Sequence, residues 1–464
     1  MKFMYYDLII LAAFCVFIFF FLRSKRKKIQ REGIIFLYRT KQGIKFMDNI
    51  AKKLKKILPV SGWIAIILGF AMMVGIIYLL IKTIFLTAII PMNAPPLLPL
   101  LPYVPQAFKL PLPPFYFVYW IIIIAVIAIV HEFAHGVFSK HNKVKVKSTG
   151  FGFLGPFLAA FVEPDEKQLA RKKPKKQMEI FAAGTFSNLI FGIIFMLILQ
   201  LFFILAYQPA GIAFMPAIAP VQISEIDFIG DYNAEEFFKL SDKQLSEINE
   251  TLEVRSNNQT YYVDQDLIKE IPFSRKIIEK NEEIYLYTDS PAFKVGMSEG
   301  GIIEIEGSTL KDTNHATEIM KEYSPGDEIS IRTSEGEFDI FLGEHPDDET
   351  QPYIGIIFLG KMRSSSIFAL VTTPYFSKDL HVKTRGNQQT TEFFRDLLIW
   401  LVLISFLVAL FNMLPVTFLD GGRMLFTLAL TLTKSKKKSR NVLKIASYLI
   451  LVIIILMMLV WMVG

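Results

Sequence analysis

The feature that most constrains this 464-residue chain is a set of long apolar runs, each near the ~20 residues that a helix needs to cross a bilayer. The runs lie at about 5–22, 63–85, 115–139, 180–207, 394–414 and 443–462. Hydrophobic residues make up 52% of the chain, while the 20% that are charged need an aqueous setting. The sequence therefore predicts a polytopic α-helical membrane protein with about six spans and an inserted soluble part.

The spacing of the runs predicts five parts. The first run has only Lys2 ahead of it and no small-residue cleavage site before the basic stretch 23–28, so we expect a retained anchor and not a signal peptide. The parts are 1–58, the anchor span and a basic loop; 59–114, a second span and a Pro-rich outer loop; 115–207, a membrane core; 208–391, a long insert; and 392–464, a core span and a C-terminal span.

Lysine and arginine cluster in 23–58, 140–176 and 434–440, which predicts that these three segments face the cytoplasm. The insert and the Pro-rich loop are then extracytoplasmic, and the cell membrane is the expected location. We interpret the formal net charge of +7 as attraction to anionic lipid and expect no nucleic-acid binding. Cys15 is the only cysteine, so neither a disulfide within the chain nor a cysteine-rich metal site is possible.

The third run ends in His131-Glu132-Phe133-Ala134-His135, the H-E-x-x-H pattern. Two histidines four residues apart lie on one face of a helix and can bind one Zn²⁺, and the glutamate between them can act as general base on water. Ionisable residues at membrane depth are costly and indicate function by default. The alternative is a hydrogen-bonded histidine pair that holds no metal.

The fifth run leads into the segment 412–423, where Pro415 breaks the helix and Gly421-Gly422 permits a tight backbone. Irregular backbone is tolerated at membrane depth only where protein or a water-filled cavity surrounds it. Asp420 on this segment fits as a third metal ligand at the depth of the two histidines. The alternative is a turn or helix cap, because Asp before Gly is common in turns.

The fourth run places Asn188 about two turns inside the membrane, at a depth comparable to the histidines. Its amide could hydrogen-bond a substrate carbonyl. The alternative is a bond to a neighbouring helix, with Gly184 permitting close packing.

H-E-F-A-H on one span, Gly184 and Asn188 on the next, and N-x-x-P-x-x-x-L-D-G-G at 412–422 together resemble the site-2 protease family of intramembrane zinc metalloproteases, in the family's order. The resemblance covers roughly 115–207 and 394–430. It implies that His131, His135 and Asp420 ligate one zinc ion, that Glu132 activates water, and that Asn188 helps to hold the substrate backbone. At position 185 this chain has Thr where the family often has Pro.

The segment 148–163 is apolar, punctuated by glycine and too irregular for a helix. It predicts either a membrane-dipping hairpin whose edge pairs with an extended substrate, or a packed connector between spans.

Within the insert, the segment 290–297, the apolar run that follows it at 302–307 and Pro325-Gly326-Asp327 together resemble a PDZ domain over about 284–360, which the family often carries here. Short strands are expected at 302–307, 328–333 and 338–342, with a helix near 315–323. No clear glycine-rich carboxylate-binding loop is present, so both peptide binding and a steric gate over the active-site entrance stay open. Residues 208–283 are either an insertion in this domain or a second, degenerate one.

The leading hypothesis is an intramembrane zinc metalloprotease that cleaves single-pass membrane proteins or peptides near the cytoplasmic face, in regulated intramembrane proteolysis or in clearance of signal-peptide remnants. The second is a non-proteolytic receptor or scaffold with a structural metal and a PDZ-like partner-binding domain. The third is an ion or solute carrier, in which intramembrane His, Asp and Asn would line a pathway.

Overall fold

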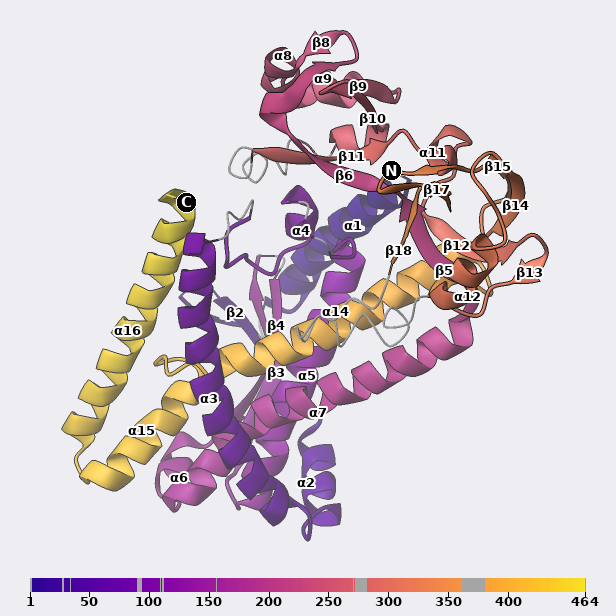
Figure 1. The fold of residues 1–464 in the computed structure, drawn as a ribbon. Coiled ribbons are helices and arrows are strands. Elements are labelled where there is room, and N and C mark those ends of the chain that lie inside the picture. The colour runs from indigo at the N-terminus through magenta and orange to yellow at the C-terminus, as the bar shows by residue number, and fades with distance from the viewer. Residues whose placement is uncertain are drawn as a thin grey trace. The chain divides into compact units, whose positions relative to one another are not determined.

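The computed structural model describes residues 2–463 except 27–28, 34, 90–93, 109, 111, 156, 270, 272–281 and 360–379. The chain divides into two compact units (Figure 1). We call them the membrane unit, Met1–Leu199 with Phe394–Gly464, and the insert unit, Gln200–Phe393. Residues 360–379 of the expected insert thus lie outside the described part of the chain.

Six helices of the described residues are long and apolar enough to cross a membrane, which confirms the expected number of spans. They are α1 (Lys2–Ser24), α3 (Leu58–Ile89), α5 (Phe117–His141), α7 (Pro174–Ala206), α14 (Gln388–Asn412) and α16 (Lys436–Val463). Large apolar side chains such as Phe19 of α1 and Leu449 of α16 are exposed, as expected where lipid takes the place of water. Pro174 opens α7 at a position where its missing N–H costs nothing.

A core of buried apolar side chains joins the helices of the membrane unit. Five helices contribute side chains to this core, and examples, one from each, are Met47, Ala65, Val137, Phe181 and Met424. The shorter helices are α2 (Ile44–Lys53), α4 (Val104–Ala107), α6 (Glu166–Ala170) and α15 (Asp420–Thr433). Because α14 ends before Pro415 and α15 begins at Asp420, this aspartate opens a helix and does not lie inside the irregular segment.

The membrane unit also contains a four-stranded antiparallel sheet in the order β1-β2-β3-β4. Its strands are β1 (Ile29–Glu32), β2 (Ile35–Thr40), β3 (Val146–Leu154) and β4 (Phe157–Pro164). The segment 148–163 therefore forms a hairpin, the first of the two predicted alternatives, and β4 lies at the edge of the described sheet; the position of this hairpin in the membrane stays a prediction. The sequence predicts a basic loop and no strands at 29–40, because the apolar run in β2 is only four residues long and lies among many lysines and arginines.

The insert unit contains a seven-stranded sheet in which β15, β14, β12, β5 and β18 follow one another, while β13 pairs with β12 and β19 with β5. The strands are β5 (Tyr207–Pro216), β12 (Gly300–Ile305), β13 (Ser308–Thr309), β14 (Glu328–Thr333), β15 (Glu337–Phe341), β18 (Ile356–Phe358) and β19 (Leu380–Thr384), and the helices are α11 (Pro291–Lys294) and α12 (Thr313–Met320). Strands and a helix thus lie where the sequence predicted them. The PDZ resemblance itself stays a prediction.

A second sheet of the insert unit lies in the chain between β5 and β12 and has its own apolar core, which includes Ile229, Phe237 and Val254. Its order is β6 (Ile218–Gln222), β11 (Glu283–Thr288), β10 (Gln259–Val263), β9 (Leu252–Ser256), β7 (Ile226–Ile229) and β8 (Tyr232–Asn233), accompanied by η2 (Ile223–Glu225), α8 (Ala234–Lys239) and α9 (Asp242–Glu247). A hairpin of β16 (Gly343–His345) and β17 (Asp348–Tyr353) completes the unit. Most of 208–283 is therefore a separate sheet inserted into the first one.

Candidate metal centre

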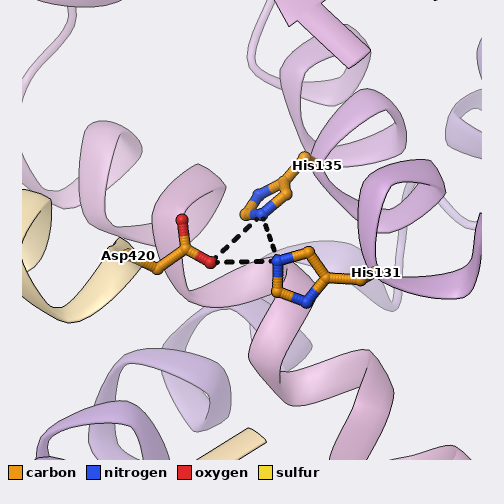
Figure 2. A group of neighbouring side chains, drawn as sticks. All are labelled: His131, His135 and Asp420. Atoms are coloured by element: carbon orange, nitrogen blue, oxygen red, sulfur yellow. Dashed lines mark hydrogen bonds and ion pairs between the residues drawn. The ribbon is translucent and has the colours of Figure 1, made fainter. Parts of the chain in front are cut away.

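Three potential ligand atoms converge inside the membrane unit (Figure 2). His131 and His135 lie one turn apart on α5, and their Nε2 atoms are 3.1 Å from each other. Asp420, at the start of α15, places Oδ2 3.2 Å from both Nε2 atoms. The structure thus brings together the three residues that the sequence predicted as ligands, from two segments almost 300 positions apart.

This arrangement suits a bound cation. Asp420 Oδ2 is buried and receives no hydrogen bond from the described residues. A buried carboxylate without partners is costly, and two imidazole nitrogens face it at 3.2 Å. Two histidine nitrogens and one carboxylate oxygen are one of the ligand sets of catalytic zinc sites, which keep a fourth position open. The residues therefore form a possible site for one zinc ion.

Helix α7 passes directly against the ligand atoms, and Gly184 is the reason that it can. A Cβ atom at this position would lie 2.5 Å from His135 Nε2 and 2.6 Å from His131 Nε2. Any larger residue would occupy the space in which the ligand atoms meet. The sequence indicates Gly184 as a point of close helix packing and as part of the family resemblance; its approach to both histidine rings becomes visible only in the three-dimensional arrangement.

The same helix contacts the far nitrogen of each histidine ring. His135 Nδ1 lies 2.6 Å from the carbonyl oxygen of Ile180. Asn188, which is 1% exposed, places its amide nitrogen 3.2 Å from His131 Nδ1. Bonds of this kind orient metal-ligating histidines. The structure therefore places Asn188 beside His131, on the side of the ring away from the other ligands.

Glu132 lies in a cavity of about 280 Å³ that the two histidines and Asp420 also line. The cavity wall includes Phe161 and Val162 of β4 and the side chains of α6, α7 and the segment that leads into α15. The backbone N–H of Val162 donates to Glu132 Oε2 at 2.8 Å. The glutamate is thus held by the edge of the sheet, an interaction that no local pattern in the sequence indicates.

A cluster of three polar side chains, Glu163, Ser148 and Arg39, lies next to the cavity. Glu163 accepts a hydrogen bond from the Ser148 hydroxyl at 2.6 Å and one from Arg39 at 3.3 Å. The hydroxyl and then the guanidinium charge lower the pKa of the Glu163 carboxyl below its ordinary value. Arg39 lies on β2, Ser148 on β3 and Glu163 on β4, so these hydrogen bonds connect three strands of the sheet beside the site.

Arg423 also lines the cavity, one helical turn after Asp420. Its guanidinium lies 5.6 Å from the centroid of the Phe181 ring and 3.8 Å from Glu166. Arg423 is not among the residues that the sequence predicts for the site, although its position in the first turn after Asp420 is a usable signal. Its half-exposed side chain brings a positive charge to a cavity that also contains the carboxylates of Glu132 and Asp420.

Comparisons with known proteins agree with this geometry. A family model described as Peptidase family M50 matches residues 119–457, a range that includes every residue of the site. The chain is also 38% identical over 168 residues to "Uncharacterized protein MJ0971" of Methanocaldococcus jannaschii. That match covers 34% of this chain and 41% of the relative, so it spans less than half of either protein.

Proposed function

Because the chain belongs to peptidase family M50, the site-2 protease family, we propose that it is an intramembrane zinc metalloprotease. One observation carries the proposal: His131, His135 and Asp420 direct their ligand atoms to one point of a cavity that also contains Glu132. A structural metal would need no general base beside it and usually has four protein ligands.

Metal binding and proton transfer are assigned to different residues of the site. His131, His135 and Asp420 would hold the zinc ion, which when bound supplies a Lewis acid for a peptide carbonyl and acidifies water. Glu132 takes the proton of the attacking water and delivers it to the leaving amine. Val162 N–H holds the Glu132 carboxylate at the cavity wall until substrate arrives. The aromatic and aliphatic lining excludes bulk water, which strengthens these electrostatic interactions.

The substrate enters as an extended segment along the outer edge of β4. An intact substrate helix shields its own carbonyls, and backbone groups released in lipid need new partners. β4 pairs only with β3 in its sheet, and its residues Phe161 and Val162 line the cavity. An added strand here would exchange main-chain hydrogen bonds with β4 and pass beside Glu132.

The substrates are single-pass membrane proteins or leftover membrane-inserted peptides, cleaved near the cytoplasmic face of the cell membrane. Support for this orientation comes from lysine and arginine, the residues that the positive-inside rule counts: 34 of the 50 lie in the membrane unit, mostly clustered in the short segments 23–58, 140–176 and 434–440, and 16 lie in residues 200–393. Residues 200–393 instead hold 33 of the 43 acidic residues. The acidic insert is extracytoplasmic and acts as a PDZ-like gate or partner-binding domain.

Reconstituted protein tests the proposal directly. The protein is placed in lipid vesicles with a single-span model substrate, and cleavage is compared for wild type and Glu132→Gln, each with and without a chelator. Glu166→Gln is the matched control, because Glu166 is an exposed carboxylate near the site that does not line its cavity. The protease is supported if wild type and Glu166→Gln cleave the substrate, Glu132→Gln does not, and the chelator abolishes all cleavage. Stoichiometric zinc with no cleavage of any single-span substrate would refute it and favour the receptor.

A further inference from the structure

Helix α7 presents three successive groups to the histidine pair at a spacing of four residues. These are the carbonyl of Ile180 against His135, the bare backbone of Gly184 against both rings, and the amide of Asn188 against His131. Positions four apart share one face of a helix, so a single face of α7 contacts both histidine rings.

The chemistry of a ligating histidine determines what Asn188 must offer. A neutral imidazole that binds metal through Nε2 carries its hydrogen on Nδ1, so this nitrogen is a donor and needs an acceptor. For His135 the acceptor is the Ile180 carbonyl oxygen at 2.6 Å. For His131 the neighbour at 3.2 Å is the Asn188 amide, whose nitrogen and oxygen exchange places on a half-turn of the side chain.

The unpaired amide oxygen supports this half-turn. With the amide nitrogen toward His131, Oδ1 is buried and has no hydrogen-bond partner among the described residues. After the half-turn, Oδ1 accepts the Nδ1–H of His131. The buried acceptor and the ring donor then satisfy one another.

We propose that Asn188 is a positioning residue, which accepts a hydrogen bond from His131 Nδ1–H and so holds that ring in its zinc-binding tautomer and orientation. Asn188 is fully buried and is absent from the lining of the cavity that contains Glu132 and Asp420. It therefore acts through His131 and not on the substrate. This inference rests on the zinc site of the proposed function, but not on proteolysis.

The first test measures zinc affinity by competition with a chromogenic chelator, in detergent-solubilised full-length protein. Asn188→Ala removes the acceptor and is expected to weaken zinc binding by about 10- to 100-fold, the usual effect of losing an outer partner of a ligand. Thr185→Val is the control, since its buried hydroxyl has no hydrogen-bond partner in the described structure and valine has the same shape. The control should bind zinc as wild type does.

Asn188→Asp separates the two roles that an asparagine can have here. A carboxylate accepts from His131 Nδ1–H but cannot donate to a substrate carbonyl, so this variant should keep zinc affinity within about threefold of wild type or exceed it. Wild-type zinc affinity in Asn188→Ala, or a tenfold loss in Asn188→Asp, would overturn the proposal. If Asn188→Ala does not fold, the aspartate variant alone decides.

The outcome is independent of whether the protein cleaves the chosen substrate. A wild-type protein that binds zinc without cleaving anything would refute the proposed function and leave the zinc measurements valid. Where activity is present, excess zinc should restore the kcat of Asn188→Ala to near the wild-type value. A kcat that stays low at saturating zinc would instead assign Asn188 to the substrate and contradict the inference.

Discussion

The backbone N–H of Val162 donates a hydrogen bond of 2.8 Å to Glu132 Oε2. Val162 is opposite Thr149 in the β3–β4 ladder, yet its N–H points to α5, so the outer edge of the sheet is in direct contact with Glu132. The same edge strand therefore holds Glu132, and in the proposed function it is also the strand that would pair with an extended peptide.

Val162→Pro tests this contact, because proline has no N–H and is tolerated on edge strands. Loss of a hydrogen bond to a charged group removes about 1.5–3 kcal/mol, and we expect kcat to fall by at least about tenfold with unchanged zinc content. Val162→Ala keeps the N–H and serves as the control. If alanine and proline lower kcat equally, the side chain and not the N–H is responsible.

The N-terminal span is joined to the catalytic span through Asp7. This carboxylate is completely buried in α1 and accepts hydrogen bonds from Phe117 N at 2.7 Å and Val118 N at 2.9 Å, as well as from the Tyr103 hydroxyl. It thus caps the first turn of α5, whose own N-cap residue Tyr116 supplies no side-chain bond.

Asp7→Ala should therefore destabilise the membrane unit by roughly 2–3 kcal/mol, since it leaves buried N–H groups unpaired. The measurement is the free energy of unfolding in mixed micelles. Tyr103→Phe removes a single hydroxyl and should cost less, about 1 kcal/mol. Equal stability of Asp7→Ala and wild type would show that α1 is only an anchor.

Local patterns in the sequence indicate the spans and the residues of the site, but not their supporting contacts. The spacing of His131 and His135 and the helix break at Pro415 can be read from a few neighbouring residues, because helix periodicity and the missing N–H of proline are local properties. The bond from Val162 to Glu132 and the approach of Gly184 to both rings depend on how distant segments meet.

The strands at 29–40 show the same limit. Lysines and arginines dominate the composition of their neighbourhood, and β1 and β2 become recognisable only when β2 pairs with β3, more than 100 residues away. In the insert, the strands of the second sheet lie in the sequence between strands of the first. The first sheet forms because β5, which precedes the second sheet in the chain, pairs with β12, β18 and β19, which follow it. Asp289-Ser290-Pro291 marks the end of the second sheet in the sequence, but the pairing of β5 with β12 across it is a long-range contact that no local pattern indicates.

Glu163 makes the stability of the sheet depend on pH. Its pKa is lowered in the folded state by the Ser148 hydroxyl and by Arg39, so its contribution is fully present above the ordinary value of 4.5 and disappears as the pH falls through the lowered value. Wild type should exceed Glu163→Gln in stability above about pH 5, by at most about 1 kcal/mol because the pair is partly exposed.

The two proteins should become equally stable in more acidic buffer. Thermal unfolding is followed with a chelator present, so that loss of metal at low pH does not contribute to the difference. Ser148→Ala, which removes the largest cause of the shift, should reduce the gap between wild type and Glu163→Gln at neutral pH. A gap that does not vary with pH would assign the effect to packing.

Gly184→Ala separates helix stability from metal binding, because the two should change in opposite directions. Alanine stabilises a helix by up to about 1 kcal/mol relative to glycine, and without metal the imidazole rings can turn away from the added methyl group, so the metal-free protein should be at least as stable as wild type. Yet the added methyl group would lie 2.5 Å from His135 Nε2, and we expect at least about 100-fold weaker zinc binding, comparable to loss of a ligand contact. Zinc content after dialysis and thermal unfolding of the metal-free protein measure the two effects.

Gly192→Ala is the matched control on the same helix. A Cβ atom there would first meet the ring of Phe406 at 3.2 Å, a side chain that can shift slightly, so this variant should keep its zinc. Stoichiometric zinc in Gly184→Ala would mean that α7 lies farther from the rings than the structure places it, and the positions of Ile180 and Asn188 against the two histidines would have to be revised with it.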